Sequence, residues 1–530
     1  MRVAGGLALG GVFAFVGVAT AMLLAHAGGG GAPLFDAYIW RVAQFTLMQA
    51  ALSTGLSILL AIPVARALAR QRDFCGRVWI IRLSVVPLGL PALVAALGVI
   101  EVWGRQGVVN DLLRLAGLQN PISVYGLAGI LIAHVFFNLP LAARFLLAAL
   151  DRIPAEYWLS SANLGMGGGA VFRLIEWPVI RRVLPGIAGL VFMLCVTSFT
   201  IVLTLGGGPA ATTIEVAIYQ ALRFDFDPQR AVLLAFLQIA VTAALLWLLS
   251  LFARPPEEGA TAGRAIRRFD GRRRRLADGL VILVFTLFTA APLAATLAAG
   301  LAADFGRLVL DPLLHRALFT SLAISFASAC LSLAIALPVV LVPRLAEAGD
   351  AGVATRLIGR ALPAVGSLIL LVPPVVVATG WFLVLRLFGE TGRFAPAVIT
   401  VINALMALPF VVRVLEPAYR THLARTARLA LSLGVTGIHR LLWIDWPALR
   451  KPFLTAFAFA MALSLGDLGA VAIFGAEGFV TLPWLLFSRM ASYRTADAAG
   501  IALILGVICL ALTLPSTAPE RPTERPAADA

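Results

Sequence analysis

Apolar residues gather along this chain in long runs separated by short polar connections, a pattern that predicts membrane-spanning helices. A helix that crosses the hydrocarbon core needs about 20 mostly apolar residues, because each residue advances it by about 1.5 Å. Twelve such runs occur, at about residues 6–27, 43–65, 83–103, 124–143, 184–205, 231–252, 279–301, 317–342, 364–386, 395–412, 453–474 and 497–515. Hydrocarbon offers the backbone no hydrogen-bond partner, so we expect each run to be helical.

The two halves of the chain resemble each other. Residues 132–250 align with residues 401–519 without a gap at a constant offset of 269. The ten matching positions of the first copy are Leu139, Pro140, Arg144, Leu164, Gly165, Ile175, Trp177, Pro178, Arg181 and Gly206. A solenoid would show many short periods, whereas this chain shows two long ones. We therefore predict an all-α polytopic membrane protein of about 12 transmembrane helices, built as two parallel six-helix repeats.

This pattern divides the chain into four parts. We expect a first six-helix module at 1–255, a basic cytoplasmic linker at 256–278, a second module at 279–515 and a Pro-rich tail at 516–530. The first apolar run is longer than the core of a typical signal peptide, so we expect it to remain as a membrane anchor.

Composition and charge agree with a membrane location. Sixty per cent of the residues are hydrophobic and 13% are charged, against about 45–50% and about 25% in soluble proteins. Only eleven of the 42 basic residues lie in the alternate connections, at Arg41, Arg105, Arg114, Arg223, Arg230, Arg307, Arg316, Arg386, Arg393, Arg489 and Arg494. This bias is the positive-inside pattern, and it places both termini in the cytoplasm. The net charge of +15 therefore indicates contact with membrane lipid rather than nucleic acid.

Motifs of catalysis are missing from the sequence. Its single lysine, Lys451, follows Arg450, whereas a phosphate-binding loop needs a lysine that follows glycine. No pattern indicates a metal site or a cofactor, and His134 fits a neutral packing role. The sequence thus predicts no enzyme, and any ATP that energises transport would bind to a partner chain.

The repeat is best preserved in two polar segments on the cytoplasmic side, 144–182 and 413–451. Residues 155–164 and 424–433 each fit a short helix that ends at a following glycine, because glycine readily adopts the left-handed conformation. Each is followed by a second amphipathic piece, at 171–177 and 438–446.

A proline follows each of these amphipathic pieces, and we expect Pro447 to stop the second one. One interpretation is a pair of helices lying on the headgroups, held by Trp177 and Trp446. The other is that both segments meet the same kind of partner.

The spacing within these segments resembles the cytoplasmic EAA loop of ABC importer permeases. Its family form is Glu-Ala-Ala, three residues, Gly, nine residues and then Ile-x-Leu-Pro. Here Trp replaces Leu, and the opening triplets read Leu159-Ser160-Ser161 and Arg428-Leu429-Ala430. The resemblance implies that each loop forms a coupling helix on an ATP-hydrolysing subunit, so that two ATPase copies bind. The implied coupling residues are Ser161, Gly165, Ile175, Trp177, Pro178, Ala430, Gly434, Ile444, Trp446 and Pro447.

Three further stretches, at 199–222, 464–475 and 481–494, resemble the fused permeases of bacterial thiamine and thiamine pyrophosphate importers. The resemblance covers residues 5–515 and implies import of thiamine or its phosphates, delivered by a periplasmic thiamine-binding protein. A fused permease for ferric iron or another small solute is the main alternative. An ion-coupled secondary transporter or a membrane enzyme is less well supported, because each would need a cluster of ionisable residues.

Asp467 is the clearest acidic residue inside a predicted span, and its repeat mate is Ser198. It lies 16 residues beyond Lys451, or roughly 24 Å along the eleventh helix, which places it in the outer half of the membrane. Ionisable groups at such depth usually face the bundle interior or a watery path. We therefore take Asp467 and Ser198 as candidates for the translocation path; the alternative is a structural Asp467 satisfied by Ser464 or by a neighbouring helix.

Overall fold

The computed structural model describes residues 2–27, 36–117, 123–252, 272–347, 371–389, 391–435, 437–475 and 479–513. Within these ranges every regular element is a helix, and eleven helices are long and apolar enough to cross a membrane. The all-α polytopic fold is therefore confirmed. The twelfth span and the two-repeat layout stay predictions, because the run expected at 364–386 lies partly outside these ranges.

The spans expected in the first half correspond to α1 (Arg2–Ala27), α2 (Ala37–Arg70), α5 (Ala92–Trp103), α7 (Leu127–Asp151), α10 (Trp177–Val196) and α13 (Pro228–Phe252). Those expected in the second half correspond to α14 (Arg272–Leu301), α16 (Pro312–Glu347), α19 (Pro374–Leu387), α20 (Thr391–Ser432), α22 (Trp446–Leu465) and α25 (Thr495–Thr513). The shorter helices are α3 (Arg77–Leu83), α4 (Val86–Gly89), α6 (Val108–Leu115), α8 (Ala155–Asn163), α9 (Gly168–Val171), α11 (Phe199–Leu205), α12 (Ile214–Arg223), α15 (Phe305–Val309), α21 (Gly437–Arg440), α23 (Gly469–Phe474) and α24 (Leu482–Ala491).

Some boundaries differ from those expected. The run at 83–103 is divided into α4 and α5, and Pro91, which has no N–H to continue a helix, precedes the first residue of α5. The helix α14 begins at Arg272, inside the predicted linker 256–278, because arginine supports a helix and can extend its charged end to the membrane surface. Residues 256–271 of the predicted linker and the tail at 516–530 lie outside the described residues.

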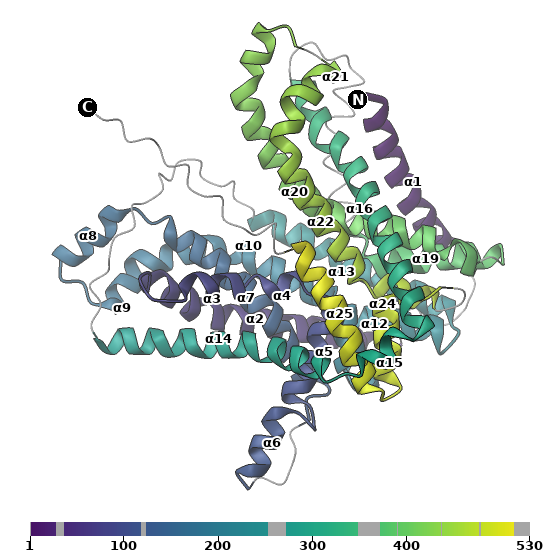
Figure 1. The fold of residues 1–530 in the computed structure, drawn as a ribbon, viewed down its shortest axis with the longest axis horizontal. Helices are drawn as coiled ribbons and strands as arrows, with labels where there is room; N and C mark the ends of the chain where they lie inside the picture. The colour runs from purple at the N-terminus through teal and green to yellow at the C-terminus, as the bar shows by residue number, and fades with distance from the viewer. Residues whose placement is uncertain are drawn as a thin grey trace.

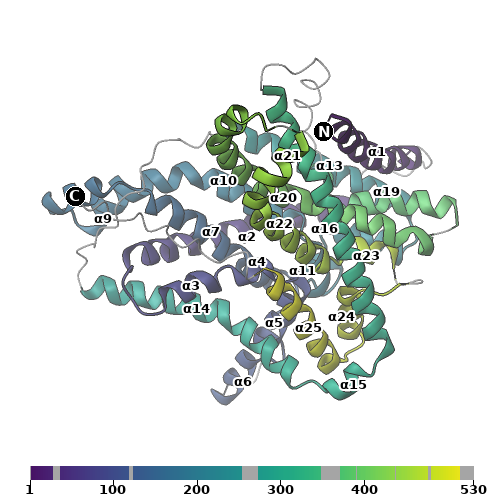
Figure 2. The same ribbon diagram turned by 45° about the horizontal axis from the view of Figure 1, so that its top comes forward.

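The first helix of each half packs against the other half. α1 contacts α19 and α16, and α14 contacts α5 and α2, as both views show (Figures 1 and 2). The indole N–H of Trp381 donates to the carbonyl oxygen of Phe15 at 3.1 Å, and the two rings stack with centroids 4.8 Å apart. The halves are thus interlocked rather than laid side by side.

A glycine permits each of these crossings. A Cβ atom on Gly98 of α5 would lie 2.5 Å from the backbone oxygen of Pro292, and one on Gly380 of α19 would lie 2.5 Å from that of Ala19. Small residues allow such close approach of helices in a membrane. The same contact therefore occurs once in each half.

The two groups of helices share a buried apolar core that includes Leu97, Val202, Val376 and Leu468. Away from this core they diverge. Figure 1 shows α8 and α9 at one end of the first group and α21 at the far end of the second, and α9 and α21 are also well apart in Figure 2. The two segments predicted to couple to an ATPase, 144–182 and 413–451, are called the coupling segments below. They therefore lie on separate arms of the molecule.

Candidate translocation path and coupling segments

The fifth predicted span of each half is interrupted. The runs at 184–205 and 453–474 divide into α10 and α11, and into α22 and α23. The expectation of unbroken helices was therefore wrong. Irregular backbone occurs at membrane depth only where protein groups or a cavity replace the lost hydrogen bonds, and both conditions are met here.

Side chains of two neighbouring helices form hydrogen bonds at the first break. Gln49 of α2 is fully buried, and its side-chain amide donates to the carbonyl oxygen of Cys195 at 2.9 Å. Asn138 of α7 donates to Cys195 Sγ at 3.3 Å. The end of α10 is thus held by two amides from the same half.

The second break has a similar arrangement. Asn403 of α20 donates from its amide to Ser464 Oγ at 3.0 Å, near the end of α22. Ser464 is the repeat mate of Cys195 at the offset of 269. An amide side chain therefore holds the corresponding residue in each half.

A cavity of about 500 Å³ adjoins both breaks and is lined by residues of both halves. Its aromatic and sulfur-containing lining consists of Phe137, Phe145, Phe199, Met406, Phe410 and Phe459. Its polar lining consists of His134, Asn138, Thr197, Ser198, Thr200, Glu215, Asn403, Arg413, Ser464, Asp467 and Thr513. The volume lies within the range of about 300–1,000 Å³ that is typical of small-molecule sites.

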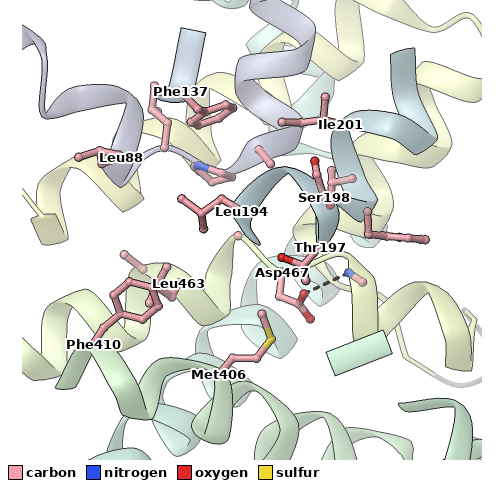
Figure 3. Close-up of a pocket in the computed structure, with 18 of the residues that line it drawn as sticks. Leu88, Phe137, Leu194, Thr197, Ser198, Ile201, Met406, Phe410, Leu463 and Asp467 are labelled. Carbon is pink, nitrogen blue, oxygen red and sulfur yellow. Dashed lines mark hydrogen bonds between the residues drawn. The ribbon is translucent and has the colours of Figure 1, made fainter. Parts of the chain in front are cut away.

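The structure brings together the two residues predicted for the path. Asp467 and Ser198 both line this cavity, and Figure 3 shows Asp467 near Thr197 and Ser198. Asp467 lies in the break rather than on a continuous eleventh helix: one carboxylate oxygen accepts from the Gly469 N–H at 3.1 Å. The other, Oδ2, has no hydrogen-bond partner among the described residues.

Sequence reasoning missed Glu215, which lines the same cavity from α12. The order of the predicted spans assigns this stretch to an outer connection, but α12 packs among α2, α13 and α19, and Glu215 is only 2% exposed. A single acidic residue within the apolar stretch 214–222 is the sign that could reveal it.

The first predicted coupling segment has the expected short helix, α8, which ends just before Gly165. Gly165 has a φ of +62°. Its N–H donates to the Ala162 carbonyl, and the Met166 N–H donates to that of Ser161 at 2.9 Å, which is a Schellman cap. Ser161 is itself buried, and its hydroxyl donates to the Trp158 carbonyl at 2.8 Å.

The second segment is built differently. Residues 424–433 are not a separate helix but the end of the 42-residue α20. Pro154 precedes α8 in the first copy, whereas Leu423 occupies the matching position here, so nothing interrupts the helix. The end is nevertheless the same: Gly434 has a φ of +63°, and the Val435 N–H donates to the carbonyl of Ala430, a buried residue, at 3.0 Å.

The prolines do not stop the amphipathic pieces, which corrects the expectation for Pro447. Residues Phe172–Glu176 and Leu441–Asp445 form single π-helical turns that lead directly into α10 and α22. The Trp177 N–H donates five residues back, to Phe172. A wider turn accommodates the missing N–H of the following proline without ending the helix.

The last residue of each π-helical turn carries a buried carboxylate. Glu176 is 1% exposed, and its carboxylate accepts from the Arg66 guanidinium of α2 at 2.6 Å. Its repeat mate Asp445 lies 2.8 Å from His422 Nε2 and 3.7 Å from the Arg440 guanidinium. The predicted residues Ile175, Trp177, Ile444 and Trp446 flank these carboxylates, so each segment is tied to a membrane-spanning helix of its own half.

Comparison with known proteins agrees with this architecture. No protein-family model matches the chain. The thiamine transport system permease protein ThiP of Brucella abortus (strain 2308) is 52% identical over 523 residues, covering 97% of this chain and 94% of that protein. ThiP of Escherichia coli (strain K12) is 43% identical over 478 residues, covering 90% and 88%. The molybdenum transport system permease protein ModB of Mycobacterium bovis is 31% identical over 214 residues, covering 40% and 78%. The chain therefore belongs to the family of thiamine transport system permease proteins.

Proposed function

We propose that this chain is the membrane-spanning permease of an ATP-driven importer that moves thiamine, or its phosphates, across the bacterial inner membrane. The names of its relatives support this substrate, and the cavity is the observation that carries the proposal. Thiamine is a flat aminopyrimidine joined to a cationic thiazolium ring. A cavity that combines aromatic side chains with the Asp467 carboxylate suits such a molecule, because aromatic faces and carboxylates both attract cations.

The two coupling segments would each dock an ATPase subunit. Their surfaces carry large exposed apolar side chains, including Tyr157 and Leu164 on the first and Leu433 and Trp443 on the second. Exposed apolar patches of this kind favour a protein partner. Since the sequence has no phosphate-binding loop, ATP would bind to two partner subunits and not to this chain.

Transport would then follow from movement of the two arms. A periplasmic binding protein would deliver the substrate at the outer face. Closure of the ATPase dimer would draw the coupling segments together, and the halves would rock to expose the cavity to each side in turn. With cytoplasmic termini, both segments face the compartment that supplies ATP.

Uptake and co-purification together test the proposal. In a strain without its own thiamine uptake, the complete transport system should restore accumulation of radiolabelled thiamine, and the purified permease should carry an ATPase with Walker motifs. Uptake that responds to the proton or Na⁺ gradient and needs no ATPase would instead identify a secondary transporter. Accumulation of labelled ferric iron but not thiamine would identify an iron permease.

A further inference from the structure

Two carboxylates face one cavity from opposite halves of the molecule. Glu215 belongs to the first half and Asp467 to the second, and both line the cavity. Each side chain also has one buried oxygen, Oε1 of Glu215 and Oδ2 of Asp467, that lacks a hydrogen-bond partner among the described residues.

No described basic residue neutralises this pair. Neither carboxylate forms an ion pair within the described part of the chain. Arg413 lines the same cavity, but it follows Asn403 by ten residues on α20, or roughly 15 Å along the helix axis. Asn403 itself contacts Ser464 near the break, so Arg413 lies well away from the carboxylates.

Two buried like charges in a largely apolar site are costly, so one carboxylate takes up a proton unless a cation balances the pair. Phe199 is an aromatic residue of the cavity lining, and its ring is in edge-to-face contact with Tyr219, which lies one turn beyond Glu215 on α12. Aromatic faces favour organic cations over small, strongly hydrated ones. The missing counter-charge therefore has the chemistry of a flat cationic ring.

We propose that Glu215 and Asp467 together form the cation-binding site of the path, and that they hold the quaternary nitrogen of the transported ring. This inference rests on the proposed function and extends it from one carboxylate to a site shared between the halves. The Ile214 N–H donates to Thr46 Oγ1 at 3.0 Å, so Glu215 follows α2, whereas Asp467 follows α22 and α23. Rocking of the halves separates the carboxylates and releases the cation.

Charge selectivity is the property to test. The complete complex is assayed for uptake of radiolabelled thiamine with two competitors: unlabelled thiamine and its neutral isostere, in which a thiophene replaces the thiazolium ring. The variants are Glu215→Gln, Asp467→Asn and the double variant. Glu215→Asp retains the charge, and Glu101→Gln is the matched control, because Glu101 lies on α5 outside the cavity lining.

The wild type and the Glu101→Gln control should prefer the cation strongly over the neutral isostere. Each neutralised variant should raise the KM for thiamine about tenfold or more, and the double variant should lose less than the product of the single effects, because both groups bind one charge. Glu215→Asp should recover part of the loss. The ratio of the two competitors' potencies does not depend on the amount of folded protein, so poor expression cannot imitate the result.

An unchanged competitor ratio in Glu215→Gln, with normal wild-type uptake of thiamine, would overturn this inference and leave the proposed function intact. A wild-type complex that takes up no thiamine would overturn both.

Discussion

Replacing Gly165 by valine should weaken the first coupling segment through backbone strain alone. The φ of +62° is a conformation that a β-branched residue adopts only under strain. A Cβ at this position would meet no atom within 4 Å, so no steric clash contributes. The left-handed conformation costs an L-residue about 1–2 kcal/mol. A cost of that size changes a local folding equilibrium by a factor of about 5–30.

The nearby Gly169 provides the matched control. A Cβ atom added to Gly169 would also meet no atom within 4 Å, but the φ of this residue is ordinary for any amino acid. The assay is the amount of ATPase that co-purifies with equal amounts of permease, together with thiamine uptake. Gly165→Val should lower both, whereas Gly169→Val should leave both near wild type. Equal behaviour of the two variants would refute the reasoning that a left-handed cap positions the coupling helix.

Three further predictions concern the ion pair of Glu176, the hydrogen bond at the first break and the charges of the coupling segments. Glu176→Gln leaves the partly buried Arg66 without its counter-charge and should cost about 3 kcal/mol, visible as a lower melting temperature of the complex; an unchanged Tm would contradict the buried ion pair. Gln49→Leu leaves the Cys195 carbonyl unsatisfied at the first break and should cost about 1–3 kcal/mol in the same assay, whereas equal stability would show that the break needs no support from α2. The second coupling segment carries the larger excess of basic residues, so its binding to the ATPase should weaken more steeply with salt. Equal salt sensitivity of charge-neutralised variants of the two segments would count against this asymmetry.

The sequence allowed the helices and the glycine caps to be predicted because both depend on local chemistry. Runs of apolar residues indicate spans whatever surrounds them, and Gly165 and Gly434 have few alternatives at the end of a helix. An ionisable residue inside an apolar run usually faces the interior. This argument also placed Asp467 and its repeat mate Ser198 in the interior, where both line one cavity.

The remaining features depend on contacts distant in the chain. An apolar run cannot reveal its own interruption, because the amide of Gln49 that supports the first break lies 146 residues from its acceptor. Nor does the sequence indicate that α1 and α14 each pack against helices of the other half, since either half offers an apolar surface. Glu215 was missed for the same reason: its burial comes from the packing of α12 among helices of both halves, including α2 and α19, which are distant from it in the chain.

Vectorial transport in reconstituted vesicles tests the central claim most directly. The permease and its ATPase are placed in proteoliposomes with the binding protein and radiolabelled thiamine on the side of the outer face, and with ATP on the other side. The account predicts accumulation of thiamine that requires both the permease and ATP hydrolysis, and that stops when the Walker lysine of the ATPase is replaced. Accumulation by the permease alone, or ATP hydrolysis that the binding protein stimulates without any movement of thiamine, would contradict it.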